Sequence, residues 1–71
     1  MTCEEFRDNV LENANKRPTY MRLGQAVFNY IDENFDVARV VQFIDKVDCF
    51  YRDDMIEEFI LSCYRRIYYN K

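Results

Sequence analysis

The sequence predicts an all-α fold: a small bundle of three main helices plus one short helix and an extended loop, forming a single helical domain over residues 1–71. Apolar residues make up 49% of the chain and aromatic residues 17%, which is enough material for a hydrophobic core. The chain has one glycine and one proline, whereas small β-folds need such residues at their many tight turns. Apolar residues also recur at helical spacing in several stretches. These observations favour helices joined by short links over a β-barrel or sandwich.

The first expected helix begins after Thr2 and ends near Asn15. Thr2 and Glu5 have the spacing of a capping box, in which each side chain bonds the other residue's backbone amide. Pro18 restricts the residue before it to non-helical geometry, so the helix must end earlier. Four apolar residues follow the cap at helical spacing: Phe6, Val10, Leu11 and Ala14.

A second helix is expected after Thr19, which can act as its N-cap. Its apolar stripe is the clearest periodic signal in the chain and comprises Leu23, Ala26, Val27, Tyr30 and Ile31. Gly24 lies inside this helix, where glycine costs about 1 kcal/mol relative to alanine. The absence of a side chain there predicts the close approach of a neighbouring backbone or aromatic ring, with a ligand or partner as the alternative.

Residues 36–52 carry a mixed signal. Asp36 can cap a short helix whose expected inward residues are Val37, Ala38, Val41 and Ile44. The β-branched content, and the alternation around Val47, Cys49 and Tyr51, also suit an extended segment. We therefore expect a short helix followed by an extended loop.

The last expected helix runs to about Tyr68. Asp54 and Glu57 have the spacing of a second capping box. The core stripe of this helix comprises Ile56, Phe59, Ile60, Cys63, Tyr64 and Ile67.

Charge and cysteine content narrow the function classes. The net charge of −3 means that the chain has no excess of basic residues with which to bind the phosphate backbone of a nucleic acid. Three cysteines without a CxxC pair, and the absence of histidine, give no expected zinc site and no base to activate a thiolate. We expect no cofactor, no metal and no catalytic residues. The free cysteines and the absence of a leader or a long apolar run predict a cytoplasmic protein.

One pattern of residues is shared with other proteins: Arg22-x-Gly24-Gln25 with Asn29, then Asp48-x-Phe50-Tyr51-x-Asp53. The chain resembles, from about residue 4 to 67, a group of short proteins of unassigned function encoded by bacteria, their phages and mobile elements. This group often has proline where the present sequence has Cys49. The resemblance implies a compact, mainly helical domain in a phage or mobile-element setting, and it supplies no catalytic residues.

Two sets of residues are candidate binding sites. The expected partner-binding surface on the last helix comprises Leu61, Tyr64, Arg65 and Tyr68, since tyrosine and arginine are enriched at interfaces. The alternative is that the two tyrosines pack under the first helix. The second set is a polar column of one guanidinium and two amides, suited to a carboxylate, a phosphate or a backbone: Arg22, Gln25 and Asn29.

Both the column and the nearby acidic residues also have structural interpretations. Gln25 or Asn29 can tie the loop around residues 47–51 to the second helix through its main-chain groups. The aspartates at 48, 53 and 54 could suggest a hard-cation site, but helix capping and backbone hydrogen bonds in the loop explain them without a metal.

The function predicted from the sequence is a non-catalytic protein-binding module, in the form of a phage or mobile-element host-interaction or counter-defence protein. Its expected partner is a bacterial host protein or a second copy of the chain in a homodimer. The alternative is a small-molecule or nucleotide binder that uses the polar column. A helix-turn-helix nucleic-acid binder is least favoured, because Arg39 is the only arginine in the segment 36–45.

Overall fold

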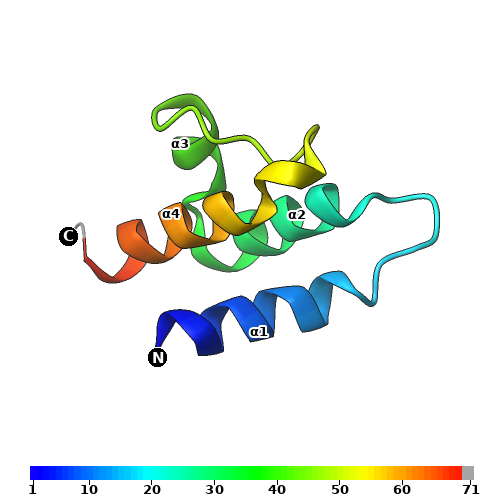
Figure 1. The fold of residues 1–71 in the computed structure, drawn as a ribbon, viewed down its shortest axis with the longest axis horizontal. Helices are drawn as coiled ribbons and strands as arrows, with labels where there is room; N and C mark the ends of the chain where they lie inside the picture. The colour runs from blue at the N-terminus through cyan, green and yellow to red at the C-terminus, as the bar shows by residue number, and fades with distance from the viewer. Residues whose placement is uncertain (70–71) are drawn as a thin grey trace.

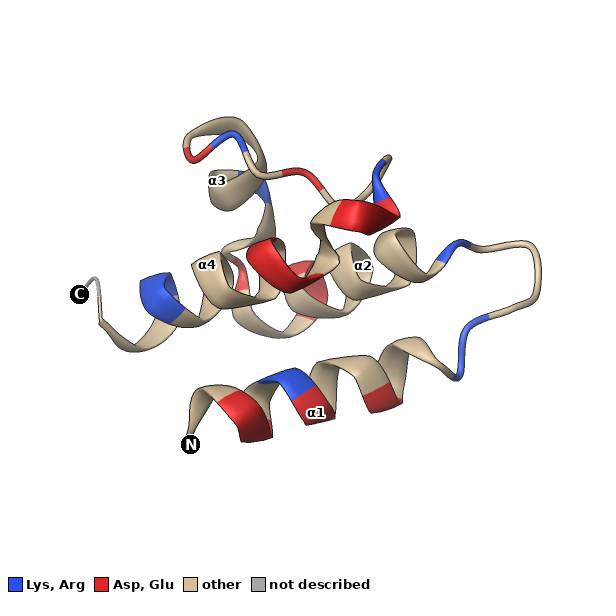
Figure 2. Ribbon diagram, in the orientation of Figure 1, with Lys and Arg blue, Asp and Glu red and all other residues tan. Residues whose placement is uncertain are grey.

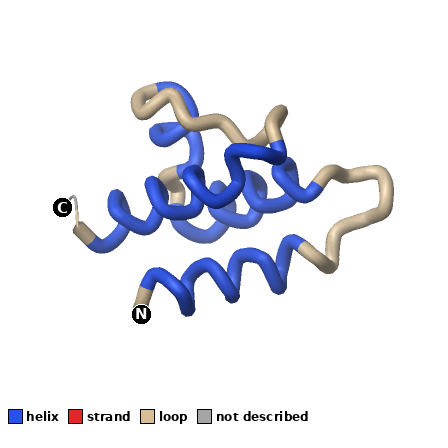
Figure 3. The backbone as a smooth tube through the Cα atoms, in the orientation of Figure 1, coloured by secondary structure: helices blue, strands red, loops and turns tan. Residues whose placement is uncertain are grey.

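The computed structural model describes residues 1–69 and confirms the all-α fold, with no strand in that part of the chain. The elements are α1 (Cys3–Ala14), α2 (Leu23–Phe35), α3 (Ala38–Phe43), the 3-10 turn η1 (Asp53–Met55) and α4 (Ile56–Tyr68). In the view of Figure 1, α1 runs in the direction opposite to α2 and α4, and α3 stands at the edge of the bundle away from α1. The long irregular segments, drawn as loops in Figure 3, join α1 to α2 and α3 to η1.

Helix α1 begins and ends as its sequence predicts. Thr2 Oγ1 accepts from the Glu5 amide at 3.1 Å, and Glu5 Oε1 accepts from the Thr2 amide at 3.0 Å, so the capping box is complete. Asn15 is the C-cap. Arg17 then holds the chain reversal by donating to the carbonyls of Met21, at 2.8 Å, and Ala14, at 3.3 Å.

Helix α2 begins at Leu23, so the prediction that Thr19 caps it is wrong. The N-cap residue is Arg22, whose side chain makes no capping bond. The carboxylate of Asp53 takes that role instead, because its Oδ1 accepts from the Gly24 amide at 3.0 Å. A carboxylate at a helix N-terminus satisfies a free amide and favourably opposes the helix dipole.

The turn from α2 into α3 also differs from its prediction. Asp36 is the left-handed C-cap of α2, with a φ of 57°, and does not cap α3. Helix α3 is short, and only Ala38 and Val41 on it are buried. Ile44 was expected in the core, but its side chain is 68% exposed.

Helix α4 follows its predicted apolar stripe, but its predicted capping box does not form. Asp54 lies in η1 and pairs with Arg52 at 2.7 Å, while Glu57 pairs with Arg7 of α1. The residues of the stripe that are buried are Ile56, Phe59, Ile60, Cys63 and Tyr64, and Ile67 is half-buried.

The core lies between α1, α2 and α4, with α3 and the following loop closing one side. Phe6 of α1 is almost fully buried, and its ring lies 5.3 Å from that of Phe35 and 5.7 Å from that of Tyr64. Charged residues lie mainly outside this core, with acidic residues along α1, in η1 and at the start of α4 (Figure 2). The fold therefore leaves α3 at the edge of the bundle, where only Ala38 and Val41 of its residues are buried.

Candidate site: a groove between α3 and the loop of residues 44–52

The loop of residues 44–52 is tied to the start of α2 by Arg22. Its guanidinium donates from Nη2 to the Phe50 carbonyl at 2.6 Å and from Nη1 to the Tyr51 carbonyl at 3.2 Å. Hydrogen bonds from a charged donor are stronger than neutral ones, and two of them fix the orientation of the loop. Hydrogen bonds between the second helix and this loop were predicted and are present, but Arg22 donates them in place of Gln25 or Asn29.

Gly24 lies directly beneath the same loop, which confirms that close packing explains this glycine. A Cβ atom added there would overlap the carbonyl oxygen of Cys49 and lie 2.6 Å from Asp53 Oδ1. The carbonyl of Gly24 in turn accepts from Cys49 Sγ at 3.3 Å. The loop can approach α2 this closely because the helix has no side chain at this position.

Asp48, in the middle of the loop, accepts a backbone hydrogen bond there, as its sequence position predicted. Its Oδ1 accepts from the Phe50 amide at 2.9 Å, which is an Asx-type turn. The same oxygen accepts from Gln42 Nε2 of α3 at 3.1 Å. The loop is thus anchored to both α2 and α3, and most residues of the predicted sequence pattern have a structural role.

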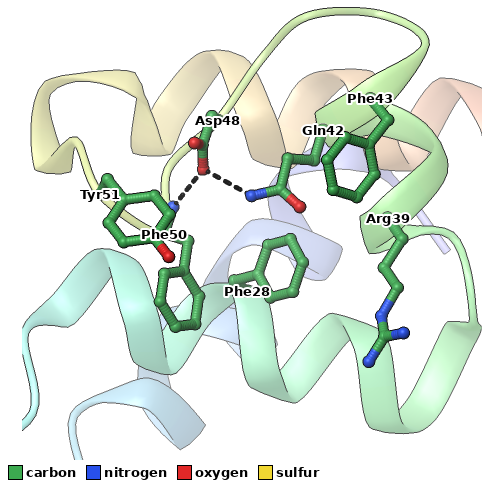
Figure 4. Close-up of a pocket in the computed structure, with 7 residues that line it drawn as sticks. All are labelled: Phe28, Arg39, Gln42, Phe43, Asp48, Phe50 and Tyr51. Atoms are coloured by element: carbon green, nitrogen blue, oxygen red, sulfur yellow. Dashed lines mark hydrogen bonds between the residues drawn. The ribbon is translucent and has the colours of Figure 1, made fainter.

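A groove of about 550 Å³ opens between α3 and this anchored loop (Figure 4). Its floor is the buried ring of Phe28 on α2, which meets Phe50 edge to face at 5.4 Å. Phe43 and Arg39 of α3 form one wall, while Phe50 and Tyr51 form the other. The bridge between Gln42 and Asp48 crosses one end.

The outer side of α3 continues the apolar wall of the groove into solvent. Phe43 is 64% exposed and Tyr51 is 67% exposed, and Ile44 is as accessible as either. We define the α3 surface as the exposed residues Val40, Phe43 and Ile44, together with Tyr51 on the facing wall of the groove. Sequence reasoning missed this surface, although a signal was present: apolar residues at 40, 43 and 44 recur at helical spacing on the side opposite Ala38 and Val41.

The four residues predicted for partner binding on α4 do not share one exposed surface. Leu61 and Arg65 are exposed. Tyr64 is buried, and its hydroxyl donates to the Met1 carbonyl at 2.7 Å. Tyr68 is half-buried against Phe6, with ring centroids 6.4 Å apart. The two tyrosines therefore pack beneath α1, as the alternative interpretation had it.

The predicted polar column of α2 is divided between different places. Arg22 is engaged by the two loop carbonyls, and Gln25 is half-buried. Asn29 lines a separate open groove between α1 and α2, together with Lys16 and Arg17. The structure does not gather the three side chains around one ligand.

The buried cysteines have the chemistry of core residues. Burial raises the pKa of the Cys49 thiol to about 12, and burial likewise raises the pKa of Cys63 above its ordinary value. Within residues 1–69 no cluster of three or more cysteine or acidic side chains has the arrangement of a metal site. These thiols stay protonated near neutral pH and are poor nucleophiles.

We expect native protein at pH 8 to react with a thiol-specific disulfide reagent at Cys3 alone, since Cys3 is half-buried whereas Cys49 and Cys63 are buried. All three thiols should react once the protein is unfolded in guanidinium chloride. The measurement is the number of thiols modified before and after unfolding, with Cys3→Ser as the control that removes the fast reaction. Rapid modification of three thiols in native protein would contradict the buried placement.

Comparison of the chain with protein-family models, with curated proteins and with solved structures finds no match. The described helices include none that is both long enough and apolar enough to cross a membrane. The groove and the α3 surface are the features of the described chain from which a function can be inferred.

Proposed function

We propose that this chain is a non-catalytic protein-binding module whose contact area is the α3 surface and the groove beside it. The observation that carries the proposal is that Phe43 and Tyr51 line the groove while about two thirds exposed, with Ile44 exposed next to Phe43. Contiguous exposed apolar patches on small proteins mark interaction sites more often than isolated exposed residues do.

The size of the patch supports this proposal. An aromatic side chain presents roughly 150–250 Å². Phe43 and Tyr51 are each about two thirds exposed, so the two rings alone leave on the order of 200–300 Å² in contact with water. Ile44 and Val40 extend this area along α3. Such a large exposed apolar surface lowers solubility. Burying it against a partner would be favourable, because removing apolar surface from water lowers the free energy.

The rigidity of the region also supports a role in binding. Asp45, at the end of α3, accepts two hydrogen bonds from Arg66 of α4, at 2.6 and 2.7 Å. Asp48 and Arg22 hold the opposite wall, as described above. A surface whose backbone is already fixed loses less conformational entropy on binding, which favours affinity.

The same proposal includes a setting. The resemblance to short phage and mobile-element proteins, together with the small size of the domain, favours a host-interaction or counter-defence role with a bacterial partner. Three free cysteines, two of them buried, favour a reducing compartment such as the cytoplasm.

The test compares capture of proteins from a bacterial lysate by three immobilised baits: the wild type, Phe43→Ser and Tyr20→Ser. Tyr20 is a matched control because it is an exposed aromatic residue in the loop between α1 and α2. We expect a specific protein that the wild type and Tyr20→Ser retain and that Phe43→Ser loses at least about tenfold, because truncating an interface hot spot costs 2 kcal/mol or more. Equal capture by all three baits, with both variants folded, would overturn the proposal.

A further inference from the structure

Arg39 places a charged group with spare hydrogen-bonding capacity at the groove. Its side chain is 74% exposed, and its Nε lies 3.7 Å from Asp32 Oδ1, which is longer than a hydrogen bond. Among residues 1–69 the guanidinium has no closer carboxylate partner. The two terminal nitrogens can therefore form the forked pair that arginine makes with a carboxylate.

The carboxylates near the groove are already engaged. Asp48, the only acidic residue among those that line it, is half-buried and accepts two hydrogen bonds. Asp45 accepts hydrogen bonds from Nε and Nη2 of Arg66. Asp32 pairs with Arg39 itself, but its side chain is 27% exposed whereas that of Arg39 is 74% exposed. The more accessible charge at the groove is therefore positive, although the whole chain carries a net charge of −3.

The dimensions of the site favour a short segment over a second copy of the whole domain. A stable interface buries about 800 Å² on each partner. The exposed rings of Phe43 and Tyr51 supply on the order of 200–300 Å², so a dimer would need most of its contact area from outside the groove. A groove of about 550 Å³ with an aromatic floor suits one or two large side chains from a helix or an extended segment.

We propose that the groove binds a short segment of a partner protein that carries a large apolar side chain and, close to it, a carboxylate. The apolar side chain packs over Phe28 between Phe43 and Phe50, and the carboxylate forms a forked pair with Arg39. This inference rests on the proposed function, because it names the chemistry of the partner for the same surface.

The test begins with selection of binders from a displayed random-peptide library on the wild-type protein. The enriched peptides are then titrated against the wild type, Phe43→Ser, Arg39→Gln and the control Lys16→Gln. Lys16 is an exposed cation beyond the end of α1, away from the groove. Each acidic peptide is also compared with its amide counterpart, in which aspartate or glutamate becomes asparagine or glutamine.

We expect the peptides to combine a large apolar residue with an acidic one and to lose at least about tenfold in affinity against Arg39→Gln, since hydrogen bonds between charged groups have this magnitude. The amide peptides should bind the wild type about as weakly as the acidic peptides bind Arg39→Gln, and Lys16→Gln should bind as the wild type does. These four combinations of protein and peptide form a double-mutant cycle, which isolates the interaction energy between Arg39 and the peptide carboxylate.

Two results separate the inference from the proposed function. Peptides that need Phe43 but contain no acidic residue and bind Arg39→Gln normally would overturn the inference and leave the protein-binding function standing. The absence of any peptide that depends on Phe43 would overturn both. A stable dimer that Phe43→Ser converts into a folded monomer would also overturn the inference, because the occupant would then be a second copy.

Discussion

Gly24→Ala should destabilise the protein by about 3 kcal/mol, even though alanine is intrinsically a better helix former than glycine. The added Cβ would overlap the Cys49 carbonyl oxygen, which belongs to the backbone and cannot rotate away. It would also press on Asp53 Oδ1 and weaken the hydrogen bond that caps α2. Relief requires the loop to move off the helix, which would loosen one wall of the groove. The measurement is the free energy of unfolding from urea titration.

The matched control for this prediction is Glu33→Ala, an exposed position on the same helix. It should change the free energy of unfolding by no more than about 0.5 kcal/mol. A Gly24→Ala variant as stable as the wild type would show that the loop does not lie against α2 as described.

Asp53→Ala should lower the free energy of unfolding by about 1 kcal/mol, because it removes the cap of α2 without adding an overlap.

Phe6→Ala should be the most damaging substitution in the core, with an expected loss of about 3–5 kcal/mol. Phe6 is almost fully buried, and its ring contacts those of Phe35, Tyr64 and Tyr68, so it joins α1 to both α2 and α4. A domain of this length has a total stability of roughly 4–10 kcal/mol, on the basis of 0.05–0.15 kcal/mol per residue. The loss is therefore a large share of the total stability, and the midpoint of thermal unfolding, measured by circular dichroism, should fall by at least about 12 °C.

Phe6→Leu is the conservative control, because leucine keeps most of the buried apolar volume. It should retain a cooperative thermal transition at a lowered midpoint. A Phe6→Ala variant that melts at the wild-type temperature would contradict the packing of α1 on the rest of the bundle.

The helices whose signals are local were predictable from the sequence. The capping box of Thr2 and Glu5 and the apolar stripes of α1 and α4 depend on residues within a few positions of one another, so spacing alone identifies them. The packing role of Gly24 followed from the cost of glycine in a helix, although the approaching atom, the Cys49 carbonyl oxygen, did not.

The features that sequence reasoning missed depend on distant residues. The cap of α2 comes from Asp53, which lies 29 residues beyond the amide it bonds, so Thr19 was a reasonable local candidate and a wrong one. The predicted capping box of Asp54 and Glu57 does not form, because Glu57 pairs with Arg7, 50 residues away along the chain. Tertiary contacts override local preferences in such places.

The candidate site was the part of the structure that was least predictable from the sequence. Tyrosine enrichment pointed to α4, but Tyr64 packs beneath α1 and is buried. On α3, Ala38 and Val41 are buried as expected, but Ile44 was placed with them and is exposed, because in a short helix with apolar residues on both sides the pattern does not show where the buried side ends. Only the position of α3 at the edge of the bundle, visible in Figure 1, distinguishes the two sides.

The most direct test of the central claim, that the α3 surface binds a partner protein, is site-specific photo-crosslinking in living bacterial cells. A benzophenone amino acid replaces Ile44, on the α3 surface, or Tyr20, in the loop between α1 and α2. We predict a discrete crosslinked product with another protein from position 44 that position 20 does not give. Products of equal yield from both positions, or from position 20 alone, would contradict the claim.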